Sequence, residues 1–139
     1  MKVDLQSVRE FFAASPFMVD LGIEPVAVGE GTLSAAMPLL RRFHQHTGQV
    51  HAGVSATLAD HTMGAAAQTL APDGFLAITA ELKTSLLRPA IGDRLLCEAR
   101  VVKAGRALSF TEAQVFAESA GHRTLVATAS ATMALVATR

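Results

Sequence analysis

One stretch, residues 51–71, limits the possible folds more than any other part of the sequence. It contains seven alanines and only two glycines, Gly53 and Gly64, and the turn sequence Pro72-Asp73-Gly74 follows it. Alanine has the highest helix propensity, and the stretch is too long and too rich in alanine for a strand. We therefore predict one long buried helix over residues 51–71. The small residues at 64–67 give this helix a thin side that a curved sheet can approach closely.

Residue periodicity predicts a short helix before this segment and strands on both sides of it. Leu5, Val8 and Phe12 lie at helical spacing, and Pro16 ends that helix. The predicted helix covers residues 4–14, the predicted strands cover residues 22–31, 32–39, 75–88, 94–103, 107–118 and 123–136, and a polar loop covers residues 41–50. A buried helix followed by an antiparallel meander is an α+β arrangement in which the sheet wraps one helix. We predict a single domain over residues 1–139.

Composition argues against several classes of partner. Lysine plus arginine and aspartate plus glutamate both number 12, so bulk electrostatics gives no reason to expect a nucleic-acid partner. No uncharged apolar run reaches the thickness of a bilayer, and the first residues have no apolar core of a signal peptide, so we expect a cytoplasmic protein without a membrane partner. The single cysteine, Cys97, lies in an apolar stretch and is interpreted as a buried, inert thiol.

The start of the predicted long helix carries a motif. His51-Ala52-Gly53 is followed, after six residues, by Asp60. Downstream come Thr79, Arg88-Pro89, Gly92-Asp93 and the turn Lys103-Ala104-Gly105-Arg106. This ordered set resembles the HGG-x6-D signature and the later elements of hot-dog thioesterases of the phenylacetate-pathway (PaaI-like) type. The resemblance implies the hot-dog fold, an antiparallel sheet wrapped around one long central helix, and hydrolysis of an acyl-CoA to free acid and CoA.

The resemblance also implies roles for individual residues. Asp60 would be the general base or the nucleophile, and the backbone N–H of Ala52 would polarise the thioester carbonyl. Gln45 would lie near the carbonyl, Thr79 would help hold the water, and His51 would orient the start of the helix. The substrate-binding residues would be Gly53, Arg88, Lys103 and Arg106, the last three as candidates for the CoA phosphates. The family usually has glycine where this chain has Ala52; an N–H donor survives that change, and the added methyl narrows the slot. No cofactor and no metal are implied, since CoA is part of the substrate.

Helix geometry constrains how these residues can act together. A helix N-terminus offers unpaired N–H groups and the positive end of the dipole, which suit a developing oxyanion. Ala52 and Asp60 are eight residues apart, which is about 12 Å along one helix. One carbonyl carbon cannot lie within about 3 Å of both. If both act on the same carbonyl, they come from different subunits, and a two-fold dimer with antiparallel central helices makes two equal sites. We therefore expect a homodimer or homotetramer.

Other interpretations fit part of the pattern. A hydroxyacyl dehydratase shares the fold but pairs a histidine with the helix acid in a proline-rich segment, and this chain has no proline between Pro38 and Pro72. A non-catalytic acyl-CoA-binding protein would merely tolerate Asp60 in its helix. His44, His46, His51 and His61 could suggest a metal site, but His44-x-His46 with Asp60-His61 is not a recognised ligand spacing.

Overall fold

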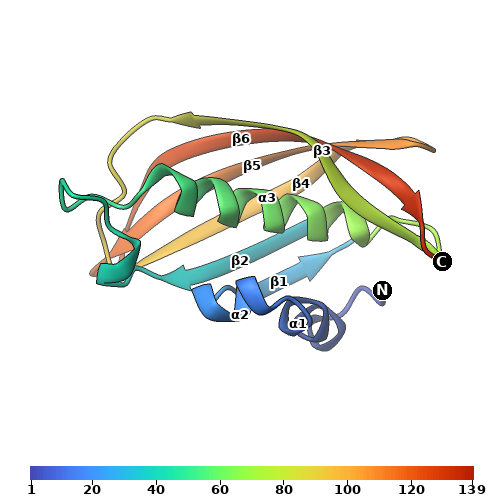
Figure 1. Cartoon of the computed structure of the whole chain (residues 1–139), viewed down its shortest axis with the longest axis horizontal. Coiled ribbons are helices and arrows are strands. Elements are labelled where there is room, and N and C mark those ends of the chain that lie inside the picture. The colour runs from blue at the N-terminus through green and yellow to red at the C-terminus, as the bar shows by residue number, and fades with distance from the viewer.

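The computed structural model describes the whole chain, residues 1–139 (Figure 1). Its elements in chain order are α1 (Leu5–Ala13), α2 (Pro16–Leu21), β1 (Glu24–Gly29), β2 (Thr32–Pro38), a 3-10 turn (Arg41–Phe43), α3 (Ala52–Gln68), β3 (Phe75–Leu86), β4 (Arg94–Ala104), β5 (Leu108–Ser119) and β6 (His122–Ala137). The types and order agree with the sequence-based prediction except at α2. No helix in the chain is both long enough and apolar enough to cross a membrane.

Pro16 begins a helix as well as following one. Proline fits the first turn of a helix because its fixed φ is suitable and its missing N–H has no partner there anyway. In this chain it is the first residue of α2, which ends at Gly22 with a φ of 73°. The prediction that a strand starts at residue 22 is therefore wrong by two residues, because Gly22 is needed as a left-handed helix cap.

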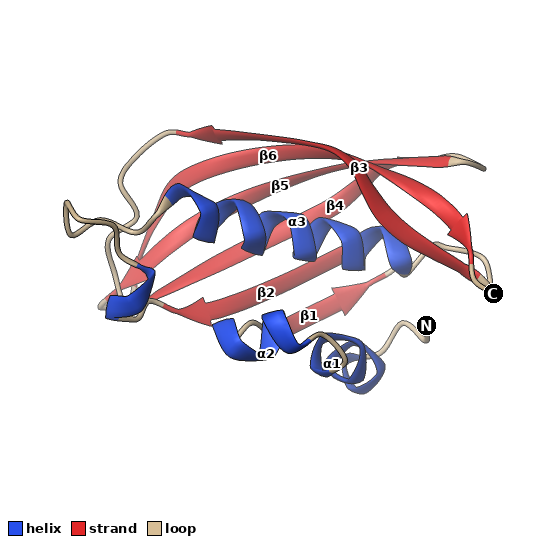
Figure 2. Cartoon of the chain, in the orientation of Figure 1, coloured by secondary structure: helices blue, strands red, loops and turns tan.

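The six strands form one antiparallel sheet in the order β1-β2-β4-β5-β6-β3 (Figure 2). Strands β4, β5 and β6 form a meander, as predicted. The prediction that β3 belongs to that meander is wrong: β3 pairs along β6, from Phe75 opposite Ala137 to Leu86 opposite Ala127. Neighbouring strands are usually joined by tight hairpins, whereas residues 87–93 form a longer connection that carries the chain across the sheet to β4.

Helix α3 lies across one face of the sheet and contacts β2 through β6. The prediction of a sheet around one long helix is confirmed. Leu58 and Met63 are fully buried between helix and sheet, and the alanines at 65–67 allow the close approach expected of a thin helix side. These residues belong to one hydrophobic core of 27 buried residues that also receives Val8 and Phe12 from α1.

The predicted buried helix is not covered on all sides by its own chain. Gly53 is exposed, and Ala56, Thr57, Asp60 and Gly64 are only half-buried. Residues spaced three or four apart lie on one side of a helix. Helix α3 therefore leaves a stripe of small residues uncovered, with one acid, Asp60, in it. We call these five residues the uncovered stripe.

The two edge strands of the sheet differ in protection. β1 is short, contains Pro25 and a register shift, and is contacted by α1, all of which hinder pairing with another strand. β3 has twelve residues and is exposed over most of its length. Its exposed apolar side chains include Ile78, Leu82 and Leu86. A long apolar edge of this kind is a template for pairing with another strand.

Candidate active site

The start of α3 is capped by His51. Its Nδ1 accepts a hydrogen bond of 2.9 Å from the Gly53 N–H, and its carbonyl accepts one of 2.9 Å from the Val54 N–H. The first N–H groups of a helix have no partner inside the helix. The Ala52 N–H makes no hydrogen bond, so it is the free donor at this helix end. A Cβ on Gly53 would lie 3.1 Å from His51 Nδ1, which explains why glycine follows Ala52 in the motif.

The loop before α3 brings Gln45 to the same place. The loop is closed by a bridge between His44 and Val50 and by a hydrogen bond of 2.9 Å from the His51 N–H to the Phe43 carbonyl. Gln45, His51 and Ala52 consequently line one cleft, with a volume of about 320 Å³.

Arg88 and the end of β3 form the other wall of this cleft, which we call the helix-start cleft. Leu86, Leu87 and Pro89 line it together with Arg88. Arg88 is held in place by a hydrogen bond of 2.9 Å from its guanidinium to the Leu125 carbonyl. The structure thus brings four of the predicted residues, Gln45, His51, Ala52 and Arg88, into one cleft.

Asp60 and Thr79 form a second group. The Thr79 hydroxyl donates a hydrogen bond of 2.6 Å to Asp60 Oδ1 and lies 3.4 Å from the Met133 sulfur. Thr79 comes immediately before the register shift in β3. At such a shift one extra residue changes which face of the sheet the following side chains point to. The second carboxylate oxygen of Asp60 makes no hydrogen bond within the chain. This free carboxylate oxygen is therefore available to a water molecule or to a carbonyl carbon that approaches from outside the subunit.

The two groups do not meet within one chain. Ala52 and Asp60 lie on the same continuous helix, Ala52–Gln68, so about 12 Å of helix separates them. Neither Asp60 nor Thr79 lines the helix-start cleft. Within one chain, the free Ala52 N–H and the Asp60 carboxylate are therefore too far apart to contact one carbonyl group.

Lys103 and Arg106 lie at the opposite end of α3 from Arg88. Arg106 lines a shallow cavity with Ala67 and Leu70, at the C-terminal end of the helix. Both cations are exposed, and neither is in an ion pair. One chain cannot place Arg88 and Arg106 around the same small group, because about 20 Å of helix lies between Ala52 and Ala67.

Comparison with known proteins identifies the family. The sequence pattern of the thioesterase superfamily matches residues 47–122, more than half of the chain, and this span contains Ala52, Asp60 and Thr79. The chain belongs to the thioesterase superfamily. The proofreading thioesterase EntH of Klebsiella pneumoniae is 32% identical to this thioesterase-superfamily chain over 98 residues, which cover 70% of the chain and 72% of EntH. The chain spans less than two thirds of the first two curated relatives it matches, 66% of one and 62% of the other.

Solved structures share the fold of this thioesterase-superfamily chain. A thioesterase family protein from Silicibacter pomeroyi is 35% identical with a TM-score of 0.91, covering 95% of this chain and 97% of that one. The E. coli PaaI protein, from the phenylacetic acid degradation operon, is 18% identical with a TM-score of 0.85, covering 96% and 93%. The BH2602 protein from Bacillus halodurans, solved with CoA, is 27% identical with a TM-score of 0.69, covering 74% and 66%. The predicted hot-dog thioesterase fold is confirmed.

Two residues of this thioesterase-superfamily chain take positions that the sequence did not reveal. Ser55 is 4% exposed and lines the helix-start cleft. Its only sequence signal was the spacing of three from Ala52, which puts the two on neighbouring parts of the helix surface. His61 packs edge-on against Phe12 with ring centroids 4.3 Å apart and stacks with Phe11 at 6.1 Å. Burial lowers the pKa of His61, and its Nε2 is buried without a hydrogen-bond partner.

Cys97 and His61 have no part in this arrangement. Burial raises the pKa of the Cys97 thiol to about 12, so the thiol stays protonated, as predicted for an inert cysteine. His61 is turned toward α1 and away from the Asp60–Thr79 pair. No group of three or more His, Cys, Asp or Glu side chains is arranged to hold a metal ion.

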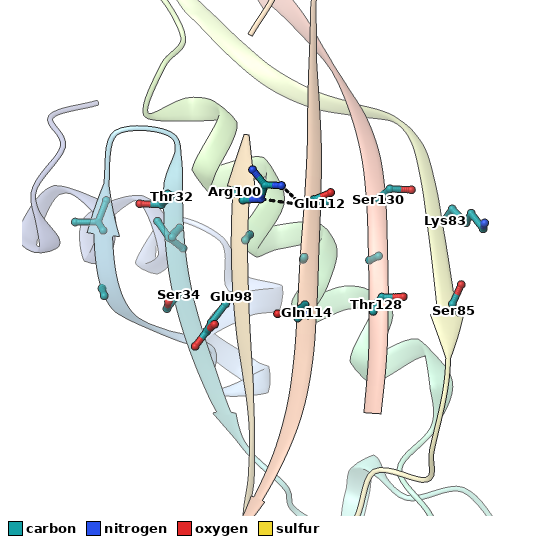
Figure 3. A pocket seen from close by; sticks show the side chains of 16 residues that line it. Thr32, Ser34, Lys83, Ser85, Glu98, Arg100, Glu112, Gln114, Thr128 and Ser130 are labelled. Atoms are coloured by element: carbon teal, nitrogen blue, oxygen red, sulfur yellow. Dashed lines mark hydrogen bonds and ion pairs between the residues drawn. The ribbon is translucent and has the colours of Figure 1, made fainter. Parts of the chain in front are cut away.

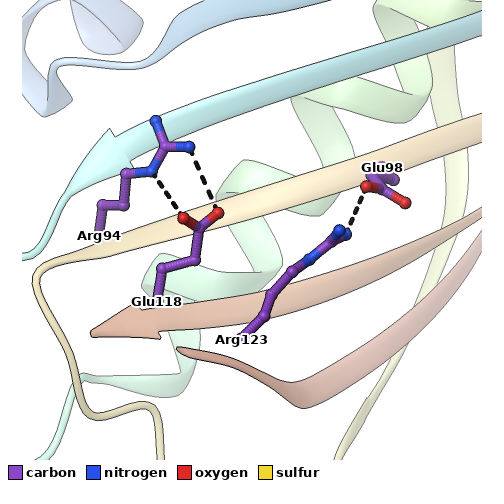
Figure 4. Close-up of polar contacts among 4 residues, drawn as sticks. All are labelled: Arg94, Glu98, Glu118 and Arg123. Carbon is purple, nitrogen blue, oxygen red and sulfur yellow. Dashed lines mark hydrogen bonds and ion pairs between the residues drawn. The ribbon is translucent and has the colours of Figure 1, made fainter. Parts of the chain in front are cut away.

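A broad trough lies on the face of the sheet opposite α3 (Figure 3). It measures about 700 Å³ and contains none of the predicted residues. Hydroxyl, amide and charged side chains line it, and Arg100 pairs there with Glu112. Further ion pairs on the sheet join Arg94 to Glu118 and Arg123 to Glu98 (Figure 4). Exposed pairs of this kind contribute little to stability, and they mark a solvated face.

Proposed function

We propose that this protein hydrolyses an acyl-CoA thioester, and that Asp60 of one subunit and Ala52 of its partner act on the same carbonyl. One observation carries the proposal. The free Ala52 N–H and the Asp60 carboxylate, which is held by Thr79 of β3, lie about 12 Å apart on one helix. Thioester hydrolysis needs a donor and an acid of these kinds, and one chain cannot bring these two to the same carbonyl. Membership of the thioesterase superfamily supports thioester hydrolysis as the reaction.

Two surfaces support a two-fold dimer. The exposed edge of β3 leaves a row of backbone N–H and C=O groups without partners, and an antiparallel β3 of a second copy would satisfy them. The uncovered stripe of α3 is made of small residues, which permits close approach of a second α3. A two-fold axis that sets Asp60 level with the partner's Ala52 passes midway between these positions, at Ala56, inside that stripe. The proposed dimer uses both surfaces.

The chemistry follows from the two halves. The Ala52 N–H, at the positive end of α3, donates to the carbonyl oxygen as negative charge develops on it. Gln45 lies beside it in the helix-start cleft and positions the carbonyl. Asp60 acts as general base on a water held with Thr79, or attacks the carbonyl carbon itself. With Asp60 as base, the water oxygen forms the C–O bond, Asp60 takes the water proton, and the C–S bond breaks so that the CoA sulfur leaves with the electron pair and takes up that proton. With Asp60 as nucleophile, its oxygen forms the C–O bond of an acyl anhydride as the C–S bond breaks. Water then cleaves the anhydride, frees the acid and Asp60, and supplies the proton that the CoA sulfur takes up.

CoA would extend across the subunit boundary. The two-fold that sets Asp60 level with the partner's Ala52 also carries the C-terminal end of α3, with Ala67, past the start of the partner's α3. The cavity that contains Arg106 adjoins Ala67, so the partner's Arg106 would lie on the same side as this chain's Arg88. Arg88, Lys103 and Arg106 would then share the phosphates of one CoA, with Gly53 at the edge of the path. A structural relative solved with CoA supports CoA as the ligand.

A thiol-release assay over a panel of acyl-CoA esters tests the proposal. The protein should release CoA from at least one ester, and Asp60→Asn should abolish the release without loss of the fold. Asp73→Asn is the matched control, because Asp73 is an exposed acid in the turn after α3. Binding of acyl-CoA without turnover would instead identify a non-catalytic binding protein, and release of water from a 3-hydroxyacyl-CoA would identify a dehydratase.

A further inference from the structure

The floor of the helix-start cleft is apolar except at one point. The buried residues that line this cleft are Val50, Ala90 and Val126, each at most 7% exposed, and Ser55, which is 4% exposed. Ser55 is thus the one polar side chain at the bottom of the cleft. Because the bottom is closed by buried side chains, the cleft suits the terminal part of a substrate and not a chain that passes through.

The Ser55 hydroxyl is not used by the protein. Helix α3 contains two other hydroxyl residues inside its length, and both bond to a carbonyl one turn back. Thr57 donates to the Gly53 carbonyl at 2.7 Å and Thr62 to the Leu58 carbonyl at 2.6 Å, which is the usual use of a hydroxyl within a helix. Ser55 makes no such bond. Unlike the Ser109 hydroxyl, which is fully buried without a partner, the Ser55 hydroxyl is not shut off from solvent. It is therefore open to the cleft and free to bond to a ligand that enters it.

We propose that Ser55 determines substrate specificity by hydrogen bonding to a polar substituent of the acyl group that enters the helix-start cleft. This inference rests on the proposed thioesterase function. The acyl group is the terminal part of the substrate and matches the closed apolar floor of the cleft, whereas CoA would leave the cleft over its exposed rim, where Arg88 lies. Ser55 follows Ala52 by three residues, about 4.5 Å of helix rise. A hydroxyl or oxo group three or four carbons along the acyl chain, or a ring hydroxyl at similar distance, would reach it.

Matched pairs of substrates test this inference. Suitable pairs are butanoyl-CoA with 3-hydroxybutanoyl-CoA and benzoyl-CoA with 3-hydroxybenzoyl-CoA. The wild-type protein should favour the hydroxylated member of at least one pair in kcat/KM by about tenfold or more, since one hydrogen bond in a buried site gives a factor of this size. Ser55→Ala should remove that preference through the hydroxylated member alone. Thr62→Val is the matched control, because the Thr62 hydroxyl already donates to the Leu58 carbonyl. This variant should keep the wild-type ratio of kcat/KM values.

The outcomes separate this inference from the proposed function. Hydrolysis of both members with the same ratio in wild type and Ser55→Ala would overturn the role of Ser55 and leave the thioesterase function intact. Failure of the wild type to hydrolyse any ester would overturn the proposed function. In that case the same substrate pairs are titrated into Asp60→Asn, and equal dissociation constants for the two members of every pair would overturn the role of Ser55. If Ser55→Ala does not fold, Ser55→Cys, which has similar volume and a weaker donor, should show a reduced ratio, and an unchanged ratio would overturn the inference.

Discussion

Thr79 of β3 and Asp60 of α3 are joined by a hydrogen bond of 2.6 Å from the threonine hydroxyl to the carboxylate. The bond links the free edge of the sheet to the uncovered side of the helix. It occupies one carboxylate oxygen and leaves the other available. This contact fixes the orientation of the acid on which the proposed chemistry depends.

Replacing Thr79 should therefore affect the rate more than the binding. Thr79→Val removes the hydroxyl at nearly constant volume, and we expect kcat on the best acyl-CoA to fall about tenfold or more, because the acid and its water lose a positioning partner. Thr79→Ser keeps the hydroxyl and should retain most of the activity. Steady-state kinetics of the two variants checks this, and equal activity of Val and Ser variants would remove Thr79 from the mechanism.

Asp60→Asn should leave the protein folded and nearly inactive. The amide is almost the same size as the acid but can act neither as a base nor as a nucleophile, and such a loss costs at least about 10²-fold in rate. Circular dichroism and thermal melting should match the wild type. Retention of more than about a tenth of the wild-type kcat would show that the assignment of Asp60 is wrong.

Position 52 offers a test of a backbone donor. Ala52→Gly keeps the N–H and should be tolerated. Ala52→Pro deletes the N–H at the first position of a helix, where proline is structurally favourable, so the helix should persist. Loss of one oxyanion donor costs about 10²–10³-fold in kcat. A folded proline variant with normal kcat would contradict the role of Ala52.

The contact between His61 and α1 makes stability depend on pH. Burial lowers the pKa of His61 below its ordinary value of 6.5. The unfolded chain therefore binds a proton at a pH where the folded chain does not, so this contribution to the free energy of unfolding is present above pH 6.5 and is lost as the pH falls below it. His61→Phe should remove this dependence on pH. The melting temperature of the variant should therefore rise relative to that of the wild type as the pH is lowered from 7.5 to 5.5. His122→Gln, at the exposed start of β6, should not change the melting temperature in this way. The same slope in wild type and His61→Phe would contradict this account.

Much of the fold was predictable because local signals agreed with the final packing. The alanine-rich run, the glycine and proline turns and the apolar periodicity placed α3 and all six strands within a few residues. The position of β3 was not predictable in the same way, because strand order depends on long-range pairing and not on periodicity. α2 was missed because Pro16 both follows one helix and begins the next.

The candidate site was predictable in its residues and only partly in its arrangement. The distance between Ala52 and Asp60 could be predicted from helix rise alone, and the structure confirms that both residues lie on one helix. Thr79 could be expected near Asp60 only from the family resemblance, since the two are distant in sequence and meet through tertiary packing. Ser55 and His61 could not be assigned, because which side of a helix faces a cleft or a neighbouring helix depends on packing.

The shared site is the central claim, and mixed dimers test it most directly. Asp60→Asn and Gln45→Ala disable opposite halves of the proposed site. A heterodimer of the two variants has one site with both defects and one site with the intact Asp60 of one chain and the intact Gln45 of the other. Random mixing makes half of all dimers heterodimers, each with one restored site of two. Unfolding and refolding the two inactive variants together should recover about a quarter of wild-type activity, whereas each refolded alone should recover none. If mass measurement confirms heterodimers and no activity returns, then Asp60 and Gln45 do not serve one carbonyl from different subunits.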